Sequence, residues 1–358
     1  MLKQTEKCRK KPLQFCAIER CLIVSLVFMA LLLTVTTSAQ EAVPVVSGGV
    51  GFVSATSKGT TTMQPVIAPV LSAPIGDRWL IESRADLRGF VFPQNGTGPY
   101  QAQFFDTLEY AQVDFLATNW LTISAGRFLT PFDIYNERLG PIWIHKFIDA
   151  PIIVPIGTTQ GYSDGVMFRG SLISRDNYQI TYVTYFSTLS TINKLESQRS
   201  AGGRTSIFFP HKRLEIGASY GRLLQSERMN FEGVFFSWEP QAAALDIKSE
   251  YAHSPHGQGY WFETGYRLAK PSVIYTGLGR LEAIGRVQQF QRLKAGSGDS
   301  LPGLDTQRVD CGAQYHFPHE VRLTATYGRQ FTKSANRNIW EFALTYRFLF
   351  PAWPGGSQ

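Results

Sequence analysis

Apolar and polar residues alternate with a period of two in long stretches of the chain. The alternation is clearest in residues 79–91, 245–252, 308–317 and 338–348. In the last stretch, one face carries the large apolar side chains Trp340, Phe342, Leu344, Tyr346 and Phe348. A period of two is typical of a β-strand that has one apolar and one polar face. These stretches are therefore predicted to be amphipathic strands.

Two features distinguish these strands from those of a soluble β-sandwich, whose strands also alternate. Several of them extend over about ten residues or more, the length that a tilted strand needs to cross a bilayer, whereas sandwich strands are shorter. Their polar faces carry several charges, and aromatic residues lie toward the ends of their apolar faces, as they do at membrane interfaces. The pattern favours an all-β fold, a closed antiparallel transmembrane β-barrel, because an open sheet edge cannot lie in lipid.

The links between strands support the same fold. We predict about 16 strands, in a range of about 14–18, that start near residues 46, 64, 78, 105, 120, 163, 177, 200, 213, 230, 242, 259, 278, 305, 320 and 338. Links on one side are short, with 269–277 as the longer exception. Links on the other side are mostly longer: 93–102, 130–162, 188–200, 253–259 and 293–303. Outer-membrane barrels have short periplasmic turns and longer external loops, and an even number of strands places both barrel ends on the periplasmic side.

The first 39 residues have the composition of a Sec-type signal peptide. Basic residues precede the apolar run 21–35, and the small residues 37–39 follow it, so the mature chain is expected to begin near Gln40. The alternative is an uncleaved anchor, but the run is shorter than the roughly 20 residues of a spanning helix. The remaining chain is then divided into a short periplasmic tail (40–45), the barrel (46–350) and a second short tail (351–358).

Removing this segment changes what charge and cysteine content imply. The segment holds six Lys/Arg and two Glu, so its removal lowers the net charge from +7 to +3. This modest charge gives no support for nucleic-acid binding. Cys8, Cys16 and Cys21 lie in the segment, and Cys311 alone remains, so no internal disulfide is expected.

The sequence contains no recognisable catalytic or cofactor-binding motif. His253 with His256, and His316 with His319, have spacings that suit metal ligands, but neither pair has a Cys or an acidic cluster beside it. Phosphate-loop, dinucleotide and nucleophile-elbow patterns are missing from the sequence. We therefore expect no cofactor, no metal, no catalytic residue and no enzymatic activity. An outer-membrane hydrolase stays open as an alternative, because geometry and not sequence defines a catalytic triad.

The polar faces of the strands are predicted to line the inside of the barrel. Their basic residues are Arg84, Arg88, Arg169, Arg204, Lys248, Arg267, Arg286, Arg308, Arg322 and Arg347. Their acidic residues are Glu82, Asp86, Asp246, Glu250, Glu263, Glu282, Asp310 and Glu341. A barrel of about 16 strands is too wide to be filled by side chains, so these charges would line an aqueous pore and tune ion passage. Alternatively, they pair with one another and merely solvate the lumen.

Residues 130–162 form the longest link and the third external loop. The segment mixes apolar side chains with the charged or titratable residues Asp133, Glu137, Arg138, His145, Lys146 and Asp149. A loop of this length is usually functional or disordered, and its apolar content argues against disorder. It either folds inward as a constriction or covers the barrel mouth as a cap. Its charges nearly cancel, so only a weak preference for anions is expected.

Residues 126–144, GRFLTPFDIYNERLGPIWI, resemble the G-R-x-x-T-P-F-x-x-Y-N-E-R segment of porins grouped with the phosphate-selective O and P type. The resemblance implies a 16-stranded outer-membrane barrel, usually a homotrimer, with a constricting third loop. The closing strand is similar to the signal read by the barrel-assembly machinery, although about ten residues follow Phe348. Phosphate-selective members carry an arginine ladder and a lysine cluster. Here acidic and basic lumen positions nearly balance, so the resemblance supports a porin more than phosphate selectivity.

Together these features predict an outer-membrane porin that is exported by the Sec route. It would be a passive diffusion channel for small hydrophilic solutes or ions, with a mild preference for anions, and its other partner would be outer-membrane lipid. The alternative is an outer-membrane barrel with a plugged lumen that acts as an enzyme or as an adhesion or structural protein.

Overall fold

The computed structural model describes residues 43–157, 161–188, 197–225, 228–241, 243–268, 277–294 and 299–351. The predicted signal peptide and residues 352–358 lie outside these ranges, as do residues 40–42 of the predicted tail 40–45. No helix in the described ranges is long and apolar enough to cross a membrane. The helical segments are η1 (Gln94–Gly96), η2 (Tyr135–Leu139), η3 (Val154–Ile156), η4 (Pro210–Lys212) and η6 (Gly277–Arg280).

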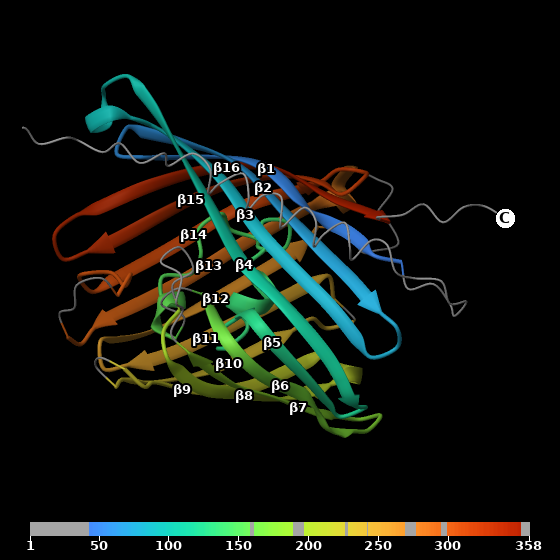
Figure 1. Cartoon of the computed structure of the whole chain (residues 1–358). Coiled ribbons are helices and arrows are strands. Elements are labelled where there is room, and N and C mark those ends of the chain that lie inside the picture. The colour runs from blue at the N-terminus through green and yellow to red at the C-terminus, as the bar shows by residue number, and fades with distance from the viewer. Residues whose placement is uncertain are drawn as a thin grey trace, which may run out of the picture. The chain divides into compact units, whose positions relative to one another are not determined.

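Sixteen antiparallel strands form one closed sheet in the described part of the chain (Figure 1). Each strand pairs with its neighbours in sequence, and β1 pairs with β16 over its whole length, which closes the barrel. The strands are β1 (Val45–Ser57), β2 (Thr60–Ile75), β3 (Trp79–Pro93), β4 (Tyr100–Thr118), β5 (Leu121–Leu129), β6 (Tyr162–Ser174), β7 (Gln179–Thr188), β8 (Ser200–Phe209), β9 (Leu214–Leu223), β10 (Asn230–Trp238), β11 (Leu245–Ser254), β12 (Gly257–Arg267), β13 (Leu281–Arg292), β14 (Thr306–His316), β15 (Val321–Thr332) and β16 (Asn336–Pro351).

The predicted fold class is confirmed, and each strand starts within about five residues of its predicted start. Strand β16 shows why the alternating pattern succeeds. Trp340, Phe342 and Leu344 are exposed on the outer surface, whereas Glu341 and Ala343 are buried inside. Successive side chains point to opposite faces of a strand, so the sequence pattern maps directly onto the two faces of the barrel wall.

The two ends of the barrel differ in their connections. We call the end that carries residues 130–161 the loop end and the opposite end the turn end. At the turn end, β2 and β3 are joined by residues 76–78, and β4 and β5 by residues 119–120. Strand β1 begins and β16 ends at the turn end, as expected for an even number of strands.

The predicted long link at 253–259 is wrong. Strand β11 ends at Ser254 and β12 begins at Gly257, so only two residues connect them. The serine and glycines of this stretch gave it the composition of a loop, but here they extend a hairpin. Gly257 is required because a Cβ there would lie 2.4 Å from the Phe290 ring of the neighbouring strand.

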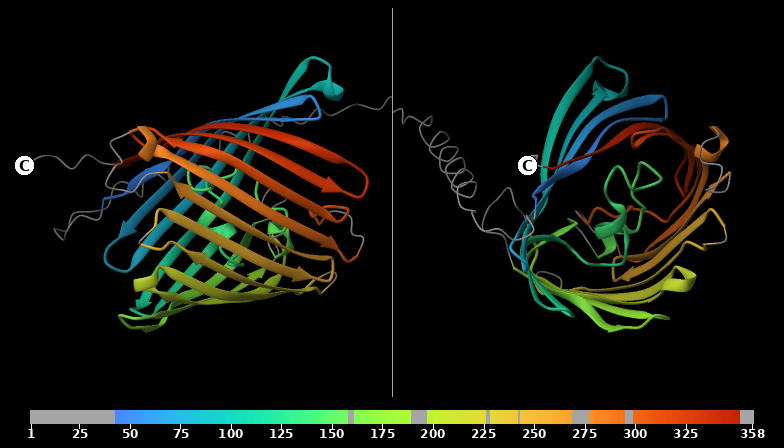
Figure 2. Two further views of the ribbon diagram at one scale, coloured as in Figure 1. Left: turned by 180° about the vertical axis from the view of Figure 1, so that it is seen from behind. Right: turned by 90° about the vertical axis from the view of Figure 1, so that its right-hand side faces the viewer.

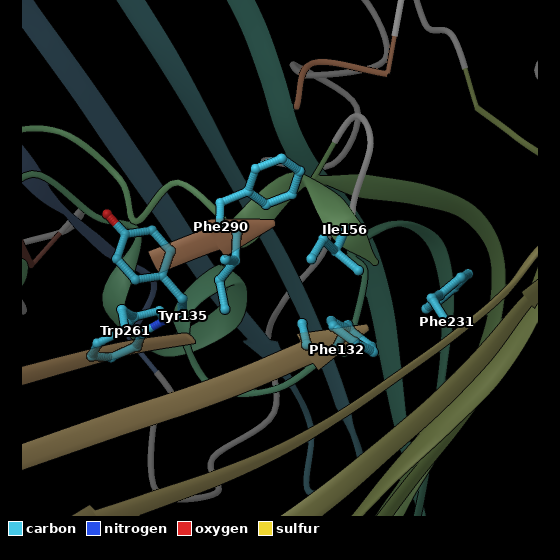
Figure 3. Packing of buried hydrophobic residues seen from close by; sticks show 8 residues of the cluster. Phe132, Tyr135, Ile156, Phe231, Trp261 and Phe290 are labelled. Carbon is cyan, nitrogen blue, oxygen red and sulfur yellow. The ribbon is translucent and has the colours of Figure 1, made fainter. Parts of the chain in front are cut away.

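Residues 130–157 and 161, which we call the inner loop, lie inside the ring of strands and not over its mouth. The view along the barrel in Figure 2 shows this green segment surrounded by the strands. Its side chains and those of the wall form the main buried apolar cluster of the described residues (Figure 3). Of the two arrangements left open by the sequence, the structure has the inward one.

Candidate functional site

The base of the inner loop is closed by one asparagine. The Asn136 side-chain amide donates hydrogen bonds to the carbonyl oxygens of Thr130 (2.9 Å) and Gly161 (2.6 Å). The Thr130 hydroxyl also contacts that of Ser163 at 2.8 Å. These bonds join the two limbs where the chain leaves β5 and enters β6. A loop that is pinched at its base loses less entropy when its tip docks.

The first limb is fixed to β9 and β11 through its backbone. The Asp133 amide donates to the Ser219 hydroxyl at 2.9 Å, and the amides of Ile134 and Tyr135 both donate to one Glu250 oxygen at 2.7 Å. The other Glu250 oxygen accepts from the Trp261 indole at 2.8 Å. This buried carboxylate is thus satisfied by three donors.

Apolar contacts reinforce this limb. Figure 3 shows Phe132, Tyr135 and Ile156 of the inner loop packed against the wall residues Phe231, Trp261 and Phe290. Phe132 and Phe231 meet edge to face with ring centroids 5.3 Å apart, and Tyr135 and Trp261 do so at 6.3 Å. Aromatic pairs in this geometry stabilise packing beyond the area they bury.

The tip of the loop reaches the seam of the barrel. Ile142 and Trp143 pack on the glycines of β1, because a Cβ at Gly49 would lie 2.5 Å from the Trp143 ring and one at Gly51 would lie 2.8 Å from Ile142. Arg322 of β15 donates to the Ile142 carbonyl at 2.9 Å. The glycines of β1 therefore leave the space that the tip occupies.

The returning limb is held by β11, β13 and β14. Lys146 forms ion pairs with Glu282 and, at 3.2 Å, with Asp246, while Gln314 donates to the Lys146 carbonyl at 2.8 Å. Gln288 accepts from the Ile152 amide at 3.0 Å. These contacts anchor the second limb to the wall.

Arg308 and Arg286 form a charge network around Asp149. Arg308 lies 2.8 Å from the Asp149 carboxylate, 2.6 Å from that of Asp310 and 3.5 Å from that of Glu341. Arg286 lies 3.2 Å from Asp310 and donates to the Asp149 carbonyl at 2.9 Å. Burial raises the pKa of Asp149, but the charges of Arg308 and Arg286 and the hydrogen bonds with Arg308 and Glu341 together outweigh it and hold that pKa below its ordinary value. Asp149 therefore stays ionised.

Burial shifts the pKa values of two loop residues toward their neutral forms. Burial and the Glu250 carboxylate raise the pKa of Asp133 well above its ordinary value, so the proton is retained more tightly. Both Asp133 side-chain oxygens are buried and lie against Gly233, where a Cβ would be 2.3 Å from one of them. Burial and the guanidinium groups of Arg322 and Arg88 lower the pKa of His145, which is therefore neutral near pH 7.

These contacts divide the inside of the barrel into two parts. We call β8–β16 together with β1 and β2 the covered wall, because the inner loop packs against it. The inward charged side chains Glu82, Asp86 and Arg88 of β3 and Arg169 of β6 form what we call the open wall. Arg169 is 42 % exposed and Arg88 is 31 % exposed, whereas Arg308 on the covered wall is 4 % exposed. Water therefore reaches the charges of the open wall.

The barrel has the fold of outer-membrane porins. OmpF from Salmonella typhi, in complex with daunomycin, superposes with a TM-score of 0.58 at 12 % identity, covering 87 % of this chain and all of that one. An anion-selective porin from Comamonas acidovorans gives 0.55 at 9 %, and a trimer form of OmpT from Vibrio cholerae gives 0.56 at 12 %. Both cover 86 % of this chain and 100 % of their own. No family model and no curated protein matches the sequence.

The structure brings many of the predicted lumen residues to the inner loop. Direct hydrogen bonds or ion pairs to it are made by Arg169, Arg204, Asp246, Glu250, Glu282, Arg286, Arg308 and Arg322. The predicted loop charges Glu137 and Arg138 pair with Arg204 (2.7 Å) and Glu215 (2.5 Å). Others pair along the wall, as Lys248 does with Asp246 at 2.5 Å and Arg88 with Asp86 at 2.8 Å.

The remaining predicted positions are less closely connected to the loop. Arg267 is half-exposed and lies 3.9 Å from Glu282, and Arg347 is exposed near the turn end of β16. Glu263 is buried near the charges of Lys146, Lys248 and Arg286. Glu82 lies on the open wall with Asp86 and Arg88.

Sequence reasoning missed several neutral partners of the loop. Ser219, Gln288 and Gln314 hold its backbone, yet only charged residues were considered as lumen candidates. The alternating sequence pattern could have identified two of them, because Gln288 lies on the same strand face as Arg286 and Gln314 lies on the same face as Asp310. Glu109 was also missed; it pairs with Arg84 where the register between β3 and β4 shifts.

Three of the four histidines in the two sequence pairs lie beside a carboxylate. His253 lies 3.2 Å from Glu232, His256 lies 3.2 Å from Asp299, and His316 lies 2.9 Å from Glu282. Within the described ranges, no group of three or more His, Cys, Asp or Glu residues is placed to hold a metal ion. Cys311 is a free thiol exposed on the outer surface of β14.

Proposed function

We propose that this protein is an outer-membrane porin that lets small hydrophilic solutes diffuse between the inner loop and the open wall. The proposal rests on one difference between the two walls: the inner loop covers the charges of one wall and leaves those of the other exposed to water. The loop is bonded to the covered wall along both limbs, whereas Arg88 and Arg169 on the opposite side keep their charges in water. A constriction fixed to one side of a wide barrel leaves a passage on the other.

The proposed channel prefers anions only weakly. Most of the basic lumen side chains lie within ion-pair distance of a carboxylate, so their fields largely cancel. His145 on the loop is neutral near pH 7, and Glu137, Arg138, Lys146 and Asp149 supply charges of both signs. A phosphate-selective site would need several free Arg or Lys donors that converge on one point. The pairing supports a general channel over a phosphate-specific one.

The proposal includes location and assembly. We place the barrel in the bacterial outer membrane after Sec export and insertion by the barrel-assembly machinery. The outward apolar surface of β16 and the other strands would face lipid. A homotrimer is the expected assembly, and detergent extraction followed by native mass measurement tests it. Recovery of the folded chain as a soluble periplasmic protein would contradict the location.

Single-channel recording in a planar bilayer tests the function. The chain from Gln40 onward, folded in detergent, should insert and give open steps of constant size that scale linearly with voltage. Folding is checked independently, because a closed barrel migrates faster on a gel when it is not boiled. A silent bilayer with well-folded protein would contradict the channel and favour a plugged barrel with another role.

A further inference from the structure

A cavity of about 760 Å³ opens at the loop end of the barrel, beside the inner loop. The second limb of the loop, the ends of β14–β16 and residues 300–304 surround it. We call this cavity the vestibule. Its volume lies in the range of sites that hold small organic molecules.

The charges around the vestibule do not balance. Lys58 and Arg337 line it, and neither forms an ion pair with any residue in the described ranges. Arg337 donates two hydrogen bonds to the Gln330 side chain, at 2.7 and 3.0 Å, which fixes its guanidinium without neutralising it. Asp149 is the carboxylate among the described lining residues, and Arg308 already neutralises it. The vestibule therefore carries a net positive charge.

The other side of the vestibule is apolar. Ile152 and Pro155 of the inner loop and Leu301 of the β13–β14 link line it, and each is only partly buried. Ile152 and Leu301 pack against the cluster around Trp261, so their positions are fixed. An inorganic anion gains nothing from this surface. A molecule with a ring or short alkyl chain gains by removing it from water.

We propose that the vestibule binds small organic anions in which a carboxylate adjoins an apolar ring or short chain. The carboxylate lies between Arg337 and Lys58, and the apolar part lies on Ile152, Pro155 and Leu301. The inference rests on the proposed channel, because it names the solutes that are concentrated at the mouth before they pass the open wall. A site of this kind raises solute flux when the solute is dilute.

Equilibrium binding of 4-fluorobenzoate to the detergent-folded protein, followed by ¹⁹F NMR, tests the site. Wild-type protein should give a saturable shift that unlabelled benzoate reverses, and inorganic phosphate should not reverse it at equal concentration. The neutral analogue 4-fluorobenzamide should bind at least about tenfold more weakly, because it lacks the charge that Arg337 and Lys58 recognise.

Matched variants separate the vestibule from general charge effects. Arg337→Gln should weaken 4-fluorobenzoate binding about tenfold, whereas Arg175→Gln, which removes an exposed arginine from the turn end, should leave it unchanged. Leu301→Ala should weaken it several-fold through lost apolar contact. Equal effects of the two arginine variants, or equal binding of the amide, would overturn the proposal.

The binding assay also distinguishes this proposal from the channel itself. Saturable binding by a protein that carries no current in a bilayer would support the proposed vestibule site and contradict the proposed channel. Current without saturable binding would support the proposed channel and overturn the proposal that the vestibule binds organic anions.

Discussion

The covered wall and the open wall are built from the same kind of alternating strand, yet they use their charges differently. On the covered wall, Glu250 and Arg308 are buried, and each bonds both to the inner loop and to other wall residues. On the open wall, Arg88 and Arg169 stay partly in water. An inward charge is therefore not by itself a pore residue. Its role depends on whether the loop covers it.

Deleting residues 133–150 should have the largest effect. The deletion removes the loop from the covered wall and widens the narrowest section, which dominates the resistance, so single-channel conductance should rise severalfold. The barrel should stay folded, as judged by its faster migration on an unheated gel. Unchanged conductance in a folded deletion variant would mean that the loop does not constrict the passage.

Glu250→Ala and Glu82→Ala compare one carboxylate from each wall. Loss of Glu250 leaves the backbone amides of Ile134 and Tyr135 and the Trp261 indole without their hydrogen-bond acceptor. This loss should weaken the free energy of loop docking by about 1–3 kcal/mol. We expect larger current fluctuations from a loosened loop. Glu82→Ala should leave the fluctuations unchanged and shift only ion preference. Equal noise in the two variants would contradict the division into two walls.

The barrel could be predicted from the sequence, but its division into a covered wall and an open wall could not. Alternation in β16 identifies its two faces without any knowledge of its neighbours. The position of the inner loop depends on contacts between residues far apart in sequence, such as Ile134 with Glu250 and Lys146 with Gln314. Local periodicity contains no information about such pairs. The same limit applies to the two-residue hairpin after Ser254, whose glycine is set by a ring on the next strand.

Arg169→Gln and Arg308→Gln should affect selectivity unequally. Arg169 lies in water on the open wall, so its removal should lower the anion-to-cation permeability ratio by up to a few-fold, most clearly at low salt. Arg308 is neutralised by Asp149, Asp310 and Glu341, so its removal should destabilise the loop more than it changes selectivity. Reversal potentials under a salt gradient measure the ratio. A larger selectivity change in Arg308→Gln would contradict the account.

A smaller, pH-dependent effect is expected from Asp133. Its pKa is raised in the docked loop, so docking is favoured while the carboxyl is protonated and weakens as pH rises through that raised pKa. The groups that face it are Glu250 from β11, Arg204 from β8 and Ser219 from β9. Current fluctuations should therefore grow with pH in the wild type and stay constant in Asp133→Asn. The same pH dependence in both proteins would assign it to another group.

Cysteine accessibility tests the central claim, that solutes pass along the open wall. Arg169→Cys and Gln314→Cys are placed separately in a Cys311→Ser chain that begins at Gln40, so that each protein carries one thiol. Arg169 is 42 % exposed, whereas Gln314 is 1 % exposed and bonded to the loop. A charged methanethiosulfonate should lower the single-channel current of the Arg169→Cys protein and leave that of Gln314→Cys unchanged. If the reagent lowers the current of the Gln314→Cys protein but not that of the Arg169→Cys protein, the result would contradict the claim that solutes pass along the open wall.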